Sequence, residues 1–182
     1  AKSLSLSLNL PLIEVNHMRA HVIANFIENK KTTPPHFPFI CLTVSGGHTQ
    51  IVLVKNINKM TILGQTLDDS AGEAFDKSAK ILGLGYPGGP IIENKSINGD
   101  PNKFIFTEPK VKDLNFSFSG LKTQIFMFLK EETKKNKNFI HENLNHLCAS
   151  IQKTIITILI NKLILAIKKN KIKNIAIAGG VA

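Results

Sequence analysis

The sequence has few cysteines, few acidic residues and no long uninterrupted apolar run. Cys41 and Cys148 are far apart and lack metal-type spacing, so both are expected to be core residues of a reduced, cytoplasmic protein. The most apolar stretch, 155–167, is shorter than the ~20 residues that a membrane-spanning helix needs, and it contains Asn161 and Lys162. The N-terminal leucines alternate with polar residues, unlike a signal peptide. No membrane association is therefore expected.

The charge balance is strongly basic, with 13 Asp and Glu against 23 Lys and Arg and a formal net charge of +10. Such a surface favours an acidic partner, and nucleic acid is the first candidate. The chain is also rich in Lys, Asn and Ile, a composition that codon bias can produce. In that case the lysines lie on solvated surfaces and bind no partner. Composition leaves both interpretations open. A length of 182 residues with 43% hydrophobic residues fits one globular domain with a core.

Short β-branched segments alternate with helical patterns along the first half of the chain. Residues 1–15 are ambiguous, because their Ser/Leu alternation is typical of a strand but the pattern starts afresh at Pro11. The apolar spacing of 17–29 predicts a helix. Residues 30–38 are proline-rich and predict a linker at a domain boundary. Three short strand patterns predict an antiparallel meander; they are 39–44, 49–55 and 60–67.

The second half is mostly helical in pattern. Ser70 and Glu73 form a capping box that begins a helix ending near Leu82. Residues 91–118 are expected to be irregular, with a possible edge strand at the end. The remaining predicted elements are a helix over 120–132 capped by Ser119, a long helix over 139–169 that is broken at most once, and a buried strand over 174–178. The whole order predicts an α/β lobe.

Two histidines share one face of the first predicted helix. His17 and His21 are four residues apart, a spacing at which two imidazoles can bind one metal ion. Met18 follows the first histidine, so the general-base glutamate of a His-Glu-x-x-His metalloprotease is lacking. Taken by themselves, two histidines at this spacing are more often ordinary surface or packing residues than metal ligands.

Several polar or glycine-rich segments could contact a ligand. In Ser45–Gln50 the glycines allow backbone N–H groups to converge on a phosphate, although a plain hairpin turn has the same glycines. Asp76 lies one turn beyond Glu73 and could accept ribose hydroxyls, or be a solvent-facing first-turn carboxylate. The glycines of 86–90 and 178–180 permit close approach of a ligand and also suit simple turns.

Six blocks in order resemble the family of tRNA N6-adenosine threonylcarbamoyltransferases. They are His17 to His21 and the segments 44–50, 69–77, 86–90, 116–123 and 178–181. The resemblance implies the actin-like ATPase fold, with two ribonuclease H-like α/β lobes around a nucleotide cleft and mostly the second lobe present. It places residues 1–36 at the end of the N-terminal lobe, with the metal-ligand helix. Residues 37–182 would be a C-terminal α/β lobe truncated at its C-terminus.

The resemblance also implies an activity and a set of site residues. The family transfers threonylcarbamoyl from threonylcarbamoyl-AMP to N6 of the adenosine beside the anticodon, in tRNAs that read codons beginning with A. His17 and His21 would bind a metal, with Fe²⁺ the usual assignment and zinc an alternative. Glu93 stands where many relatives have Asp. The implied substrate-binding residues are Thr43, Val44, Ser45, Gly46, Gly47, Asp76, Gly89 and Glu93.

The implied partners are tRNA, a non-catalytic paralogue subunit and a small ATPase subunit. The family's third metal ligand, an Asp, and an Asn after the last glycine block would lie beyond Ala182. The chain alone is therefore expected to be truncated, to bind metal weakly and to be inactive. Two alternatives stay open: an ATPase or sugar kinase of the same fold, which needs no histidine pair, and a non-catalytic scaffold paralogue.

Overall fold

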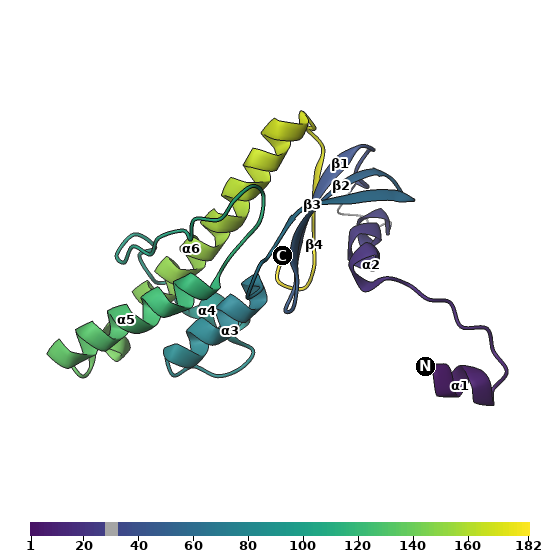
Figure 1. Ribbon diagram of the computed structural model, residues 1–182. Coiled ribbons are helices and arrows are strands. Elements are labelled where there is room, and N and C mark those ends of the chain that lie inside the picture. The colour runs from purple at the N-terminus through teal and green to yellow at the C-terminus, as the bar shows by residue number, and fades with distance from the viewer. Residues whose placement is uncertain (28–32) are drawn as a thin grey trace.

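The computed structural model describes residues 1–27 and 33–182 and has an α/β architecture. A four-stranded sheet with the order β3-β2-β1-β4 lies between two groups of helices (Figure 1). The strands are β1 (Phe39–Val44), β2 (Thr49–Asn56), β3 (Lys59–Gln65) and β4 (Ile175–Ala178). The helices are α1 (Lys2–Ser7), α2 (His17–Ile23), the 3-10 helix η1 (Ala24–Phe26), α3 (Ala71–Ile81), α4 (Gly88–Ser96), α5 (Ser119–Lys135) and α6 (Phe139–Asn170).

The sheet confirms the predicted meander and adds β4 to its other side. β1 pairs antiparallel with β2 and parallel with β4, and a parallel pair requires a crossover, which α3–α6 provide. Alternate residues of β1 face opposite sides. Ile40, Leu42 and Val44 belong to the larger core with α3–α6, whereas Phe39 and Cys41 pack in a smaller core that includes a residue of α2. Helix α2 and helices α3–α6 therefore cover opposite faces (Figure 1).

Helix α6 is the longest element and runs unbroken over 32 residues. Leu147, Ile151, Ile155 and Ile158 are at most 1% exposed and form much of its core face. Among the described residues it is the one helix long and apolar enough to cross a membrane, and 44% of its most apolar window is buried. A core helix passes the same test, so this is weak evidence, and the absence of membrane association stays a prediction.

Two segments adopt helices that the sequence reading does not predict. Residues 2–7 form α1 in place of the expected strand, and none of its residues is buried, so its leucines contact no core that would select a strand. Helix α4 occupies Gly88–Ser96, within a region expected to be loop and irregular chain. Pro90 lies in its first turn, where the missing N–H of proline removes no helical hydrogen bond. Glycine and proline thus begin this helix instead of excluding it.

Three smaller predictions are also wrong. The expected edge strand near Phe116 is reduced to a single bridge with Thr66. Ser119 is the first residue of α5 and not its cap, because its hydroxyl donates to Asp68. The predicted buried strand, β4, is buried on one face only, since Ile175 and Ile177 are each 48% exposed.

The predicted N-terminal helix is shorter than expected. It appears as α2 followed by η1, and residues 28 and 29 lie outside the described part of the chain. The linker predicted over 30–38 also begins outside it. The division into regions 1–36 and 37–182 stays a prediction.

Candidate functional site

The predicted metal ligands lie together at the start of α2. Asn16 caps this helix by accepting a hydrogen bond from the Arg19 backbone N–H at 3.1 Å. The Arg19 guanidinium donates to the Ile57 carbonyl at 2.9 Å, which anchors α2 to the β2–β3 turn. The helix then brings His17 Nε2 within 3.1 Å of His21 Nε2, with the rings edge to face. His17 is exposed and His21 half-buried, on a helix that Arg19 anchors to the β2–β3 turn.

The spacing of the two nitrogens suits one shared metal ion. Two metal–nitrogen bonds of 2.0–2.1 Å at a tetrahedral angle place the nitrogens about 3.3 Å apart. The same 3.1 Å between His17 and His21 also allows one neutral ring to donate a hydrogen bond to the other. No group of three or more His, Cys, Asp and Glu residues with metal-binding geometry occurs among the described residues. The pair therefore fits a metal as two of its ligands.

A third imidazole lies near the pair. The ring of His48 is 6.3 Å from the ring of His17, centroid to centroid. In the sequence, His48 belongs to the glycine loop, and nothing in its spacing connects it to α2. The β1–β2 turn places it there, because β1 packs on α2 through the core residue Val22. Sequence reasoning missed this proximity since it depends on the tertiary packing.

The predicted phosphate loop, Ser45–Gly47, is a tight turn held by hydrogen bonds between its own residues. The Ser45 hydroxyl donates to the His48 carbonyl at 3.2 Å and accepts from the His48 N–H at 3.1 Å. Gly46 and Gly47 are exposed and a side chain at either would meet nothing within 4 Å. Thr43 is fully buried, with Oγ1 3.9 Å from the sulfur of its neighbour Cys41, so its side chain faces the α2 side of the sheet.

The first turn of helix α3 packs against this loop. The predicted Ser70–Glu73 capping box is present, and the Ser70 hydroxyl also donates to the Gly46 carbonyl at 2.6 Å. Gly72 packs directly against the loop, because a Cβ there would lie 2.7 Å from the Gly46 Cα. Only glycine permits that approach. The position of the loop is therefore set by the first turn of α3.

Asp76 connects α3 to α4. Its Oδ1 accepts a hydrogen bond from the Gly88 N–H at 2.7 Å, which leaves Oδ2 free of protein partners among the described residues. A Cβ on Gly88 would lie 2.7 Å from the Cβ of Ala79, so the two helices touch at this glycine. The predicted ribose ligand thus has a structural contact as well as one available oxygen.

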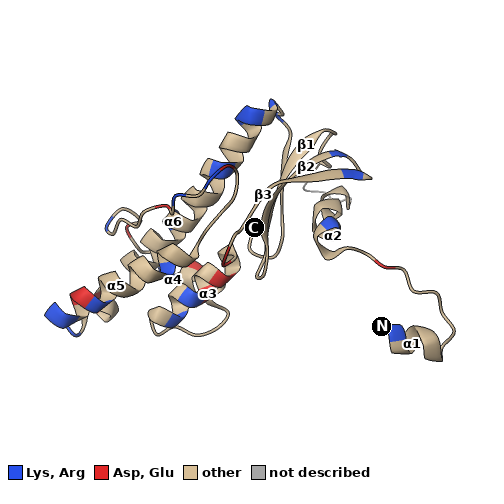
Figure 2. Cartoon of the chain, in the orientation of Figure 1, with Lys and Arg blue, Asp and Glu red and all other residues tan. Residues whose placement is uncertain are grey.

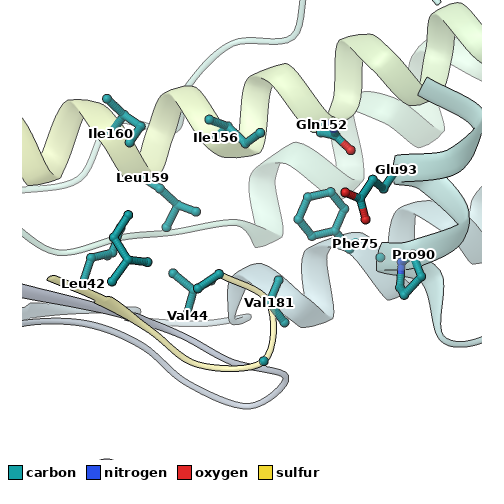
Figure 3. Close-up of a pocket in the computed structure, with 14 residues that line it drawn as sticks. Leu42, Val44, Phe75, Pro90, Glu93, Gln152, Ile156, Leu159, Ile160 and Val181 are labelled. Atoms are coloured by element: carbon teal, nitrogen blue, oxygen red, sulfur yellow. The ribbon is translucent and has the colours of Figure 1, made fainter. Parts of the chain in front are cut away.

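A cavity of about 420 Å³ lies between the sheet, α4 and α6. In Figure 3 the Phe75 ring and the side chains of Glu93 and Gln152 gather at one end, and aliphatic side chains of β1 and α6 occupy the other. Its described lining residues are Leu42, Val44, Phe75, Gly89, Pro90, Glu93, Gln152, Ile156, Leu159, Ile160, Ile177, Gly180, Val181 and Ala182. Three predicted substrate-binding residues, Val44, Gly89 and Glu93, therefore line one cavity.

The turn after β4 connects this cavity to the histidine pair. Gly179 has a positive φ of 109° and a Cβ there would lie 2.0 Å from the Val44 carbonyl oxygen, so the turn needs glycine. Its other side forms a second hollow, lined by His21, Gly179 and Ala182 among others. Ala182 lines both spaces. His21 and the predicted nucleotide residues thus lie on either side of the turn of residues 179–182.

Comparisons with known proteins identify the family of the chain. Residues 1–182 match the family model of TsaD, tRNA N6-adenosine threonylcarbamoyltransferase. Proteins of that name from Riemerella anatipestifer and Christiangramia forsetii are each 58% identical over all 182 residues, which cover 53% and 54% of their lengths. The chain spans about half the length of these curated relatives.

The fold is also that of a solved protein with little sequence similarity. The crystal structure of (R)-2-hydroxyglutaryl-CoA dehydratase component A from Acidaminococcus fermentans matches with a TM-score of 0.52 at 14% identity. The match covers 100% of this chain and 59% of that one. It supports the actin-like ATPase fold expected from the sequence. With its fold, its ordered motifs and a family match over its full length, the chain belongs to the tRNA N6-adenosine threonylcarbamoyltransferase family.

Proposed function

We propose that the protein transfers threonylcarbamoyl from threonylcarbamoyl-AMP to N6 of the adenosine beside the anticodon, in tRNAs that read codons beginning with A. The amine attacks the carbamoyl carbon and loses one proton to solvent, the bond from that carbon to the phosphate oxygen breaks, and AMP leaves. One observation carries the proposal beyond family membership. The turn of residues 179–182 has the cavity with Val44 on one side and the hollow with His21 on the other. One substrate can therefore have its nucleotide in the cavity and its threonylcarbamoyl group near His21.

The substrate residues divide by position. Val44, Gly89 and Glu93 would enclose the adenosine, because they line the cavity directly. Asp76 would hold the ribose with its free oxygen. The loop of Ser45–Gly47 would receive the phosphate, since its two glycines are exposed and unobstructed. Thr43 would contribute only backbone groups, because its side chain is buried on the other face.

The histidine pair would hold Fe²⁺, with zinc as the alternative. A metal bound there supplies Lewis-acid polarisation of the threonylcarbamoyl group. The chain's own contribution is orientation: the Asn16 cap and the Arg19 anchor fix α2, and α2 fixes both rings. Holding a weakly nucleophilic adenine amine against the carbamoyl carbon is itself a large part of such catalysis.

The macromolecular partners follow from the same proposal. They are tRNA, a non-catalytic paralogue subunit and a small ATPase subunit, acting in the cytoplasm. Figure 2 shows the basic residues spread over several helices and the strand ends instead of forming one stripe. The net charge of +10 therefore favours tRNA binding in general without defining its surface.

The activity is tested by incubating the full-length protein and its partner subunits with threonylcarbamoyl-AMP and unmodified tRNA, and measuring the modified nucleoside by mass spectrometry. We expect modification that is lost in the double variant His17→Ala, His21→Ala. The matched control, His141→Ala, alters a histidine on α6 and should retain activity. Modification that persists without both α2 histidines would contradict the proposed role of the pair.

Metal binding is measured separately from activity. Anaerobic titration with Fe²⁺ or Zn²⁺, followed by elemental analysis, should give stoichiometric metal in the full-length protein and in its His141→Ala variant. The double variant should lose it, since a single protein ligand rarely retains a metal. Equal metal content in all three proteins would place the metal elsewhere.

A further inference from the structure

Gln152 is the one amide side chain among the described residues that line the cavity. It lies on α6 four residues before Ile156 and seven before Leu159, so all three share the helix face that points into the cavity. The side chain is half-buried and makes no hydrogen bond to any described residue. Figure 3 shows it near Glu93 and the Phe75 ring, at the polar end of the cavity.

The cavity offers the Gln152 amide almost no hydrogen-bonding partners, so a bound ligand has to supply them. Apart from Glu93, the described side chains of the cavity are apolar. A ligand that displaces water from this end must satisfy both the carbonyl and the NH₂ of the amide, or lose their hydrogen bonds to water. The Phe75 ring beside it offers a flat apolar surface, as an aromatic ligand ring prefers.

Adenine satisfies that requirement and the 6-oxopurines do not. Adenine presents a donor, its N6 amine, beside an acceptor, N7, and a glutamine amide pairs with both at once. Guanine and hypoxanthine present two acceptors there, O6 and N7. One amide NH₂ can serve only one of them well, and the amide carbonyl would face the other.

We propose that Gln152 is the residue that selects adenine, through a two-point contact of its amide with N6 and N7 of the base. This inference rests on the proposed function, which places the nucleotide of the substrate in this cavity. Glu93 has acceptors only, so it suits a ribose hydroxyl or the second amine hydrogen and does not by itself distinguish N7. Gln152 therefore determines base specificity, and Glu93 contributes affinity.

The test compares AMP with IMP, which differs in having O6 in place of the amine. Dissociation constants of both are measured by calorimetry for the full-length wild type and for its Gln152→Leu and control Gln65→Leu variants. Gln65 is an exposed residue of β3 outside this cavity, and its variant makes the same chemical change. Circular dichroism and thermal unfolding check that each variant is folded.

Wild type and Gln65→Leu should prefer AMP by about 5- to 150-fold, the discrimination typical of a bidentate amide–adenine pair. In Gln152→Leu the AMP affinity should fall by a similar factor, so that the ratio of the two dissociation constants approaches one. An unchanged ratio in Gln152→Leu overturns the inference, as does a wild type that binds AMP and IMP equally; the proposed function survives both results. A wild type that binds neither nucleotide overturns the proposed function as well.

Discussion

Asp68 offers the sharpest test of how the site is held in place. Its carboxylate accepts four hydrogen bonds from the segment that begins α5. Oδ1 accepts from the backbone N–H groups of Phe118 and Ser119 at 2.8 and 3.3 Å. Oδ2 accepts from the hydroxyls of Ser117 and Ser119 at 2.6 and 2.8 Å. Asp68 lies two residues before Ser70, which caps α3 and bonds the glycine loop, so the contact joins α5 to the supports of the site.

The replacement Asp68→Ala removes all four acceptor contacts. At about 0.5–1.5 kcal/mol for each hydrogen bond, the sum is about 2–6 kcal/mol. Asp68 is largely exposed, so water can replace part of each contact, and the expected loss is about 2 kcal/mol. For a chain of this size that corresponds to a fall in Tm of about 4–8 °C. Asp68→Asn keeps an acceptor for the two N–H groups and should lose about half as much.

The pH dependence gives an independent reading of the same contact. Burial would raise the pKa of Asp68, but hydrogen bonds from Ser117, Phe118 and Ser119 outweigh it and lower this pKa below its ordinary value. The stabilisation is therefore complete above the unfolded pKa of about 3.9, and it is lost as the pH falls through the lower folded value. The difference in stability between wild type and Asp68→Asn should thus be constant near neutrality and vanish in acid.

Thermal unfolding and hydrogen exchange of the Phe118 amide measure both effects. The amide should exchange faster in Asp68→Ala, because its acceptor is gone. If Asp68→Ala had the wild-type Tm at pH 7 and the Phe118 amide remained equally protected, the contact would contribute nothing and the reasoning would fail. A double variant of Ser117 and Ser119 to Ala, which removes only the hydroxyl donors, should fall between wild type and Asp68→Ala.

Three further predictions concern the core and the loop support. Gly72→Ala should destabilise by about 1–3 kcal/mol, measured by urea unfolding, because its Cβ would overlap Gly46; a stabilised variant would contradict the close packing. Ser70→Ala should cost about 1 kcal/mol in the same assay, and more if the bond to the Gly46 carbonyl contributes. Burial raises the pKa of the Cys41 and Cys148 thiols to about 11, so neither should react with a thiol reagent at pH 8 until urea unfolds the chain.

Local chemistry was sufficient to predict much of this protein. The capping box at Ser70 and Glu73 depends on residues three apart, and the structure has it as predicted. The meander of β1–β3 also follows from short-range alternation and turns. The order of the motif blocks identified the family, because many short matches in one order rarely arise by chance. Each of these conclusions needs only neighbours along the chain.

The predictions fail where the tertiary environment of a segment, and not its residue pattern, determines its secondary structure. Residues 1–15 alternate like a strand, but the described structure gives their leucines no buried contact, and α1 forms instead. Gly88–Pro90 reads as a loop, yet Asp76 binds the Gly88 N–H and α4 begins there. Ser119 has the composition of a cap, but its hydroxyl contacts Asp68.

The sequence by itself determined the family, the fold class and the histidine spacing on one helix. Only the tertiary structure brought His48 near His17, and placed Gln152 and Glu93 at the same end of one cavity. It also showed that the turn at Gly179 lies between this cavity and the hollow lined by His21. The physical reason is that the parallel pairing of β1 and β4 brings together segments separated by most of the chain, and no local pattern encodes such a contact.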